Sequence, residues 1–234
     1  GPSPAPASNL SEFWDNFRDL GGLPVRAGRR LKSGLLFRSG HWSKLTPDDH
    51  EAIDTLRIAR VFDFRSEDEA ERNPSLLPAG VVREHLPVEG GSMPMQAIDD
   101  ALLAGEPERI ACDFLVDANR AFVREQAPVF RRFLQSLLDD LDAPQNFHCT
   151  AGKDRTGLAA ALLLSALDVE PDAIWHDYLR SNDARRQVNV RILDEVRANT
   201  ASRLGHARAR AMDLTPVQNL LIVKRDYLQA AFDA

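Results

Sequence analysis

Short apolar runs alternate along the chain with amphipathic stretches of helical period. The runs follow turn signals or are rich in β-branched and aromatic residues, and we predict strands at residues 35–38, 58–64, 81–86 and 145–148. Between two of these runs, apolar side chains recur at helical spacing at Ile110, Phe114, Leu115, Ala118 and Phe122. Strands that alternate with helices predict an α/β fold with a mostly parallel central sheet flanked by helices.

Local signals mark where the helices begin. Helix starts carry a capping residue or an early proline at Thr46-Pro47, Ser66, Pro128 and Pro171. The helix that follows Ser66 is short and acidic, and Asn73-Pro74 ends it. Residues 158–167 are almost wholly apolar, so the helix that contains them is predicted to be central and buried.

The first residues differ in composition from the rest of the chain. Gly1-Pro2-Ser3 resembles a protease-cleavage scar, and the Pro/Ala/Ser-rich stretch after it has the composition of a disordered segment. We therefore assign residues 1–9 to a scar and a disordered tail. No low-complexity linker or internal repeat follows, so residues 10–234 are predicted to form a single domain.

Composition and charge exclude several classes of protein. The chain is 44% hydrophobic and 27% charged, as in ordinary globular proteins, and no run reaches the ~18 apolar residues that span a bilayer. A net charge of −6 argues against nonspecific nucleic-acid binding. Two cysteines are too few for a disulfide scaffold, and the histidines lack the paired spacing of a metal site, so we expect no cofactor. Oligomeric state and compartment, cytoplasmic or exported, stay open.

The most informative stretch is HCTAGKDRTG at residues 148–157, between a predicted strand and the buried helix. Parallel sheets bind ligands at the carboxyl ends of their strands, and a helix N-terminus favours a phosphate-sized anion. Gly152 lets the backbone curve closely around such a ligand. The electropositive site stabilises the thiolate of Cys149, and Arg155 is placed to hold two phosphate oxygens. This arrangement predicts attack on phosphorus, a phosphocysteine intermediate and its hydrolysis.

These residues match the His-Cys-x5-Arg-Thr/Ser signature of cysteine-dependent protein tyrosine phosphatases, which the chain resembles. Further matches follow the order seen in a bacterial branch similar to mycobacterial tyrosine phosphatase B, at residues 16–22, 37–40, 63–66 and 177–182. The resemblance implies a protein tyrosine phosphatase-like fold. It also implies hydrolysis of phosphotyrosine, often of phosphoserine and phosphothreonine, and of phosphoinositides, so phosphorylated proteins or phosphoinositides are the expected partners.

The loop residues take their expected roles from this match. Phosphate binding is assigned to Thr150, Ala151, Gly152, Lys153, Asp154, Arg155 and Thr156, and His148 supports the loop. The chain has no Trp-Pro-Asp tripeptide to supply a general acid. The resemblance implies Asp154 as the proton donor, and Glu89 and Asp63 are the second and third alternatives. The other interpretation of Asp154 is a structural carboxylate paired with an arginine.

Other segments leave two interpretations open. Lys153 would contact additional phosphates on an inositol ring, or would lie solvated at the rim of the cleft. Residues 93–103 lie where related phosphatases build a helical lid, so they would form a lid or a helix packed permanently on the sheet. Cys112 lies on the predicted apolar helix face, and we expect a core thiol there.

Alternative functions belong to other classes. A non-catalytic phosphate-binding module, or pseudophosphatase, usually lacks one of Cys149, Asp154 and Arg155, and all three are intact. An enzyme mainly specific for inositol phosphates or phosphoinositides uses the same nucleophile on another substrate. A rhodanese-like sulfur transferase also has a cysteine in an anion-binding loop, but the Lys-Asp-Arg-Thr continuation into a buried helix gives it little support.

Overall fold

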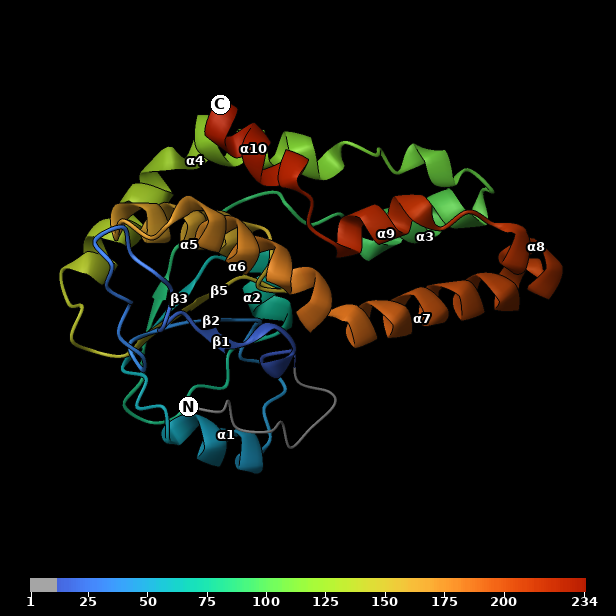
Figure 1. Cartoon of the computed structure of the whole chain (residues 1–234). Helices are drawn as coiled ribbons and strands as arrows, with labels where there is room; N and C mark the ends of the chain where they lie inside the picture. Colours follow the sequence, from blue (N-terminus) through green and yellow to red (C-terminus); the bar gives the residue numbers. More distant parts are fainter. Residues whose placement is uncertain (1–11) are drawn as a thin grey trace.

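A computed structural model describes residues 12–234, and the scar and tail expected at residues 1–9 lie outside the described residues. Figure 1 shows a central sheet with helices on both sides and a group of helices that extends away from it. The strands are β1 (Arg18–Asp19), β2 (Leu36–Ser39), β3 (Arg60–Asp63), β4 (Val82–His85) and β5 (Gln145–His148). The longer helices are α1 (Pro47–Asp54), α3 (Met95–Leu103), α4 (Phe114–Leu138), α5 (Arg155–Ala166), α6 (Pro171–Ala184), α7 (Arg186–Leu204) and α10 (Arg225–Asp233). The shorter ones are η1 (Trp14–Asn16), α2 (Glu67–Arg72), η2 (Pro107–Arg109), α8 (His206–Ala211) and α9 (Thr215–Leu221).

The sheet has the order β1-β2-β5-β3-β4. The strands β2, β5, β3 and β4 run parallel, and only β1 pairs antiparallel within the described sheet. The prediction of a mostly parallel α/β fold is therefore confirmed. The edge strand β1 was not predicted, because its two residues are charged and carry no apolar pattern. The central position of β5 places the loop after it at the middle of the carboxyl edge.

Alternating side chains of the strands supply two cores on opposite faces of the sheet. In β3, Phe62 packs into the larger core with Phe133 and Phe147, and Val61 packs into the smaller core. The larger core is covered by α4, α5 and α10, which lie together on one side in Figure 1. The helix α5 is buried along most of its length, as its apolar sequence predicted, because helices α4, α6 and α10 surround it.

The long helix α4 has a kink where the sequence predicted a new start at Pro128. Gln126 leaves helical geometry with φ of −131°, two residues before the proline. Proline lacks an N–H and its ring crowds the carbonyl one turn back, which explains a kink at this point.

The expectation of a core thiol at Cys112 was wrong. This thiol is exposed, because α4 begins only at Phe114 and Cys112 lies in the turn before it.

The segment expected to be a lid is helical but does not pack on the sheet. Helix α3 buries Ile98 and Leu102 in a third apolar cluster with Val196 of α7 and Val217 of α9. Figure 1 shows α3, α7, α8 and α9 side by side, away from the strands. The alternative of a helix packed on the sheet is therefore wrong, and a mobile lid stays a prediction.

Within residues 12–234, no helix is both long enough and apolar enough to cross a membrane.

Candidate active site

The loop between β5 and α5 is bent around Gly152. This residue has a positive φ of +73°, which side chains disfavour, and an added Cβ would lie 2.1 Å from the Ser39 carbonyl oxygen. The adjoining helix begins at Arg155, so its first amides point toward the loop. Glycine at this position allows the backbone at the end of β2 to lie in close contact with the loop.

The carbonyl groups of the loop are bound on the outer side. The Thr150 carbonyl accepts a hydrogen bond from the His41 amide at 3.0 Å. The Gly152 carbonyl accepts from Asn16 Nδ2 at 2.9 Å and from Arg38 Nη2 at 2.7 Å. Within residues 12–234, the amides of residues 150–154 have no hydrogen-bond acceptor. Carbonyls held outward and free amides together form an anion-binding nest.

A buried ion-pair network holds those outer contacts in place. Arg38 Nη1 donates to Asp177 Oδ2 and Arg18 Nε donates to Asp177 Oδ1, each at 2.8 Å. Burial alone would raise the pKa of Asp177, but the two guanidinium groups more than offset this and lower it. The motifs at residues 16–22, 37–40 and 177–182 thus meet behind the loop of residues 149–154, hereafter the phosphate loop.

We expect Gly152→Ala to destabilise the fold by about 2–4 kcal/mol, because the methyl group would overlap the Ser39 carbonyl. Urea denaturation measures this. The matched control is Gly22→Ala, which shares a positive φ of +88° but has no neighbour within 4 Å of its Cβ. We expect that control to cost only about 1 kcal/mol. Equal losses for the two variants would contradict the close approach at Gly152.

Cys149 and Arg155 are both buried at the ends of this loop, 3% and 2% exposed. Burial alone would lower the pKa of Arg155, but the hydrogen bonds to Glu69 and the charge of the Cys149 thiolate more than offset it and raise the pKa. Cys149 thus interacts electrostatically with the guanidinium, although the residue also belongs to the larger apolar core. Thr156 Oγ1 is buried without a hydrogen-bond partner among the described residues, so its hydroxyl is free to donate to a thiolate.

Glu69 is the site residue that the sequence reasoning missed. Its two carboxylate oxygens accept from Arg155 Nη1 at 2.7 Å and Nη2 at 2.9 Å, and one of them also accepts from the Thr150 hydroxyl. Burial alone would raise the pKa of Glu69, but these bonds lower it to about 2. Glu69 also closes the capping box with Ser66. The sequence signal at Glu69 is the Ser-x-x-Glu pattern. This pattern predicts the helix cap but not the contact of Glu69 with Arg155.

The remaining donors of Arg155 face a second segment, residues 88–92. Nη1 donates to the Val88 carbonyl at 3.2 Å, and Nη2 donates to Ser92 Oγ at 3.3 Å. Nε is buried and has no partner among the described residues. Glu69 thus fixes the plane of the guanidinium while Nε stays available to an anion at the loop.

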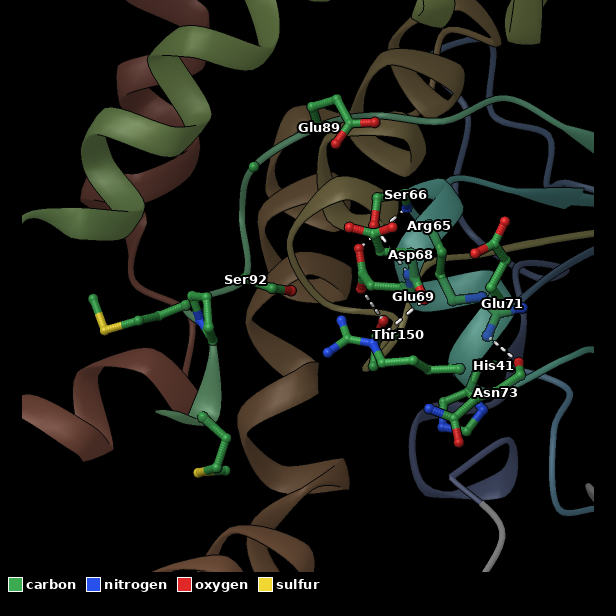
Figure 2. Close-up of a pocket in the computed structure, with 15 residues that line it drawn as sticks. His41, Arg65, Ser66, Asp68, Glu69, Glu71, Asn73, Glu89, Ser92 and Thr150 are labelled. Carbon is green, nitrogen blue, oxygen red and sulfur yellow. Dashed lines mark hydrogen bonds between the residues drawn. The ribbon is translucent and has the colours of Figure 1, made fainter. Parts of the chain in front are cut away.

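A cavity of about 750 Å³ lies against this group of residues. Figure 2 shows its lining side chains, which come from α2, from the loop at Glu89 and Ser92, and from Thr150 and His41. Met93, Pro94 and Met95 supply an apolar part of the wall. The cavity therefore leads from solvent to the mouth of the phosphate loop, where Thr150 and Glu69 meet.

Comparison with known proteins identifies the family. The family described as "Tyrosine phosphatase family" matches residues 11–234. The chain belongs to this tyrosine phosphatase family. It is 37% identical over 222 residues to a putative tyrosine-protein phosphatase of Cupriavidus necator, and the alignment covers 94% of this chain and 75% of that protein. It is 31% identical over 243 residues to the triple specificity protein phosphatase PtpB of Mycobacterium tuberculosis, with 92% and 84% covered.

The three candidate proton donors of this tyrosine phosphatase occupy different surroundings. Asp154 is buried in the loop, where one carboxylate oxygen accepts from Lys153 Nζ and the other has no partner among the described residues. Glu89 is exposed on the cavity wall. Asp63 is fully buried and binds Arg65 and Arg83, each within 3 Å.

Asp63 cannot donate a proton at neutral pH. Burial alone would raise its pKa, but His148 and Arg65 more than offset this and hold the pKa well below its ordinary value. Both carboxylate oxygens already accept hydrogen bonds from guanidinium groups. The third alternative of the sequence analysis is therefore withdrawn, and Asp63 is an ion-pair partner.

Two further residues of the phosphatase loop have structural partners. Burial lowers the pKa of His148 to about 4, so its ring is neutral at pH 7, and Nδ1 donates to the Cys149 carbonyl at 2.8 Å. Lys153 is 5% exposed, so the interpretation as a solvated charge at the rim was wrong.

Within residues 12–234, no group of three or more His, Cys, Asp or Glu side chains is arranged to hold a metal ion.

Proposed function

We propose that this phosphatase hydrolyses phosphate monoesters, phosphotyrosine foremost, through covalent catalysis by Cys149. The observation that supports this most is the loop itself. Its carbonyls are bound from outside and its amides have no acceptor among the described residues, with Cys149 at one end and the oriented guanidinium of Arg155 at the other. Such a nest binds the phosphate oxygens and stabilises the charge that develops on them in the transition state.

The proposed reaction has two steps. The Cys149 thiolate attacks phosphorus, so an S–P bond forms and the ester P–O bond breaks, and the leaving oxygen takes a proton from Asp154. Water then attacks the phosphocysteine, its proton returns to the Asp154 carboxylate, and the S–P bond breaks to release inorganic phosphate and the thiolate. Arg155 holds the equatorial oxygens in both steps.

We expect Asp154→Asn to slow phosphoserine peptides about 10²–10³-fold and p-nitrophenyl phosphate much less, because nitrophenolate leaves without a proton. Steady-state kinetics on both substrates measures the difference. Glu89→Gln is the matched comparison, since it removes the other candidate donor on the cavity wall. Equal slowing of both substrates by Asp154→Asn, together with a leaving-group effect in Glu89→Gln, would move the proton donor to Glu89.

The proposed substrates extend beyond phosphotyrosine. One relative is named a triple specificity protein phosphatase, which supports phosphoserine and phosphothreonine proteins as further substrates. Phosphoinositides are the remaining class that the resemblance implies. The apolar wall of Met93, Pro94 and Met95 supports an aryl ester, because thioether and ring contacts are favourable for an aromatic leaving group.

Turnover of p-nitrophenyl phosphate and a phosphotyrosine peptide by the wild-type chain, in the presence of EDTA, tests the proposal. We expect hydrolysis of both and competitive inhibition by vanadate. Binding of the peptide without hydrolysis would assign the chain to the pseudophosphatases. Sulfur transfer from thiosulfate at a higher rate than ester hydrolysis would assign it to the rhodanese-like enzymes.

A further inference from the structure

The cavity beside the phosphate loop carries carboxylates that are not used to hold the loop. Asp68 and Glu71 lie on α2, and Glu89 lies on the segment that faces it (Figure 2). All three are exposed, and none of them forms an ion pair with another residue in the range 12–234. Glu69 differs, because both of its oxygens are bound by Arg155. The outer part of the cavity is therefore acidic.

Most of the basic side chains that line this cavity already have partners. The Arg65 guanidinium binds both oxygens of Asp63. The His41 ring contacts Glu12 through Nε2 and Ser43 through Nδ1. Arg72 is the one lining guanidinium for which the described residues provide no carboxylate partner. Three unpaired carboxylates against one unpaired guanidinium leave a negative potential around the entrance.

Lys153 does not change this balance. Its side chain is 6% exposed, its Nζ donates to Asp154, and it is absent from the cavity lining. The phosphate loop therefore presents one cation to a ligand, Arg155, whose position suits a single phosphate. A ligand that bears further phosphates would therefore find no second free cation in this loop.

We propose that this cavity selects phosphopeptides with Lys or Arg beside the phosphorylated residue and disfavours polyphosphorylated inositols. The inference rests on the proposed function, because the phosphate position is the same. One phosphate is neutralised by the loop amides and Arg155, while a neighbouring ammonium or guanidinium group lies close to Asp68 and Glu71. Each additional phosphate meets like charge there, so repulsion adds to the selectivity.

The test measures binding to the Cys149→Ser variant, so that turnover does not affect the result. Two phosphotyrosine peptides, identical except for Lys or Glu on both sides of the phosphotyrosine, are compared by fluorescence anisotropy. We expect the lysine peptide to bind about 10-fold more tightly at low salt, because each rim charge contributes modestly. The difference should shrink several-fold at about 0.5 M salt, where the Debye length is short. Soluble inositol trisphosphate should bind more weakly than the lysine peptide.

A matched pair of variants on α2 locates the effect. Asp68→Lys, added to Cys149→Ser, should abolish or reverse the preference for the lysine peptide. Glu67→Lys should leave it unchanged, because Glu67 is exposed in the same first turn of the helix but does not line this cavity. The two substitutions place the same charge near the helix N-terminus, so they share any cost to the helix.

Equal affinity for the two peptides, or the same loss in both α2 variants, would overturn the inference. Tighter binding of inositol trisphosphate than of the lysine peptide would overturn it too and would favour a phosphoinositide headgroup. Wild-type turnover of p-nitrophenyl phosphate reports separately on the proposed function. Turnover without charge selectivity refutes only the inference, and charge-selective binding without turnover refutes only the proposed function.

Discussion

Replacing Cys149 by serine should lower kcat for p-nitrophenyl phosphate by roughly 10⁴-fold or more, because the reaction loses its proposed nucleophile. A neutral hydroxyl in the same position is a far weaker nucleophile than the thiolate. The anion nest is made of backbone amides and Arg155, and none of these is changed by the substitution. The variant should therefore still bind inorganic phosphate with an affinity close to that of the wild type.

The control for this variant is Cys112→Ser, which changes the exposed cysteine in the turn before α4 and should keep full activity. Steady-state kinetics on both variants, with thermal denaturation to confirm folding, gives the comparison. Substantial turnover by a folded Cys149→Ser variant would mean that another group attacks phosphorus. Loss of activity in Cys112→Ser would point instead to an unspecific effect of thiol removal.

Replacing Arg155 by lysine should lower kcat by about 10²–10³-fold, although the positive charge is kept. The guanidinium binds Glu69 with two parallel hydrogen bonds at 2.7 and 2.9 Å and still offers Nε to an anion. A lysine ammonium cannot make both sets of contacts in fixed directions. Glu69 would then be partly unpaired beside the phosphate, and its charge would oppose binding.

The same substitution at Arg120, Arg120→Lys, is the control, because Arg120 forms an exposed pair with Asp117 on α4. We expect it to leave kcat and KM unchanged, since exposed ion pairs contribute little. Full activity of Arg155→Lys would show that a positive charge is sufficient at this position. It would contradict the geometric role that Glu69 and Arg155 are assigned together.

Much of the fold could be predicted because its signals are local. The run at residues 58–64 contains β3, and the caps at Thr46 and Ser66 mark the starts of α1 and α2. The loop with Cys149 was found in the same way, since a strand, a glycine turn and an apolar helix follow one another in sequence. By contrast, β1 consists of two charged residues that are fixed by partners far along the chain, such as Asp177.

The part of the site that could not be predicted depends on tertiary contacts. Glu69 reaches Arg155 only because β3 lies beside β5, which places the start of α2 next to the phosphate loop. Lys153 was expected to face the ligand or the solvent, but its side chain is buried and its Nζ binds Asp154, the next residue along the chain. Cys112 was wrongly predicted to be buried, because the helical spacing of apolar residues was taken to begin before Phe114, where α4 starts.

The phosphorylated enzyme is the most direct test of covalent catalysis by Cys149. The Asp154→Asn variant, which lacks the proposed base for the second step, is mixed with p-nitrophenyl phosphate and denatured within its first turnovers. Peptide mass spectrometry then locates any added phosphoryl group. We expect one phosphoryl group on Cys149. Turnover with no modified Cys149, or a phosphoryl group on another side chain, would contradict it.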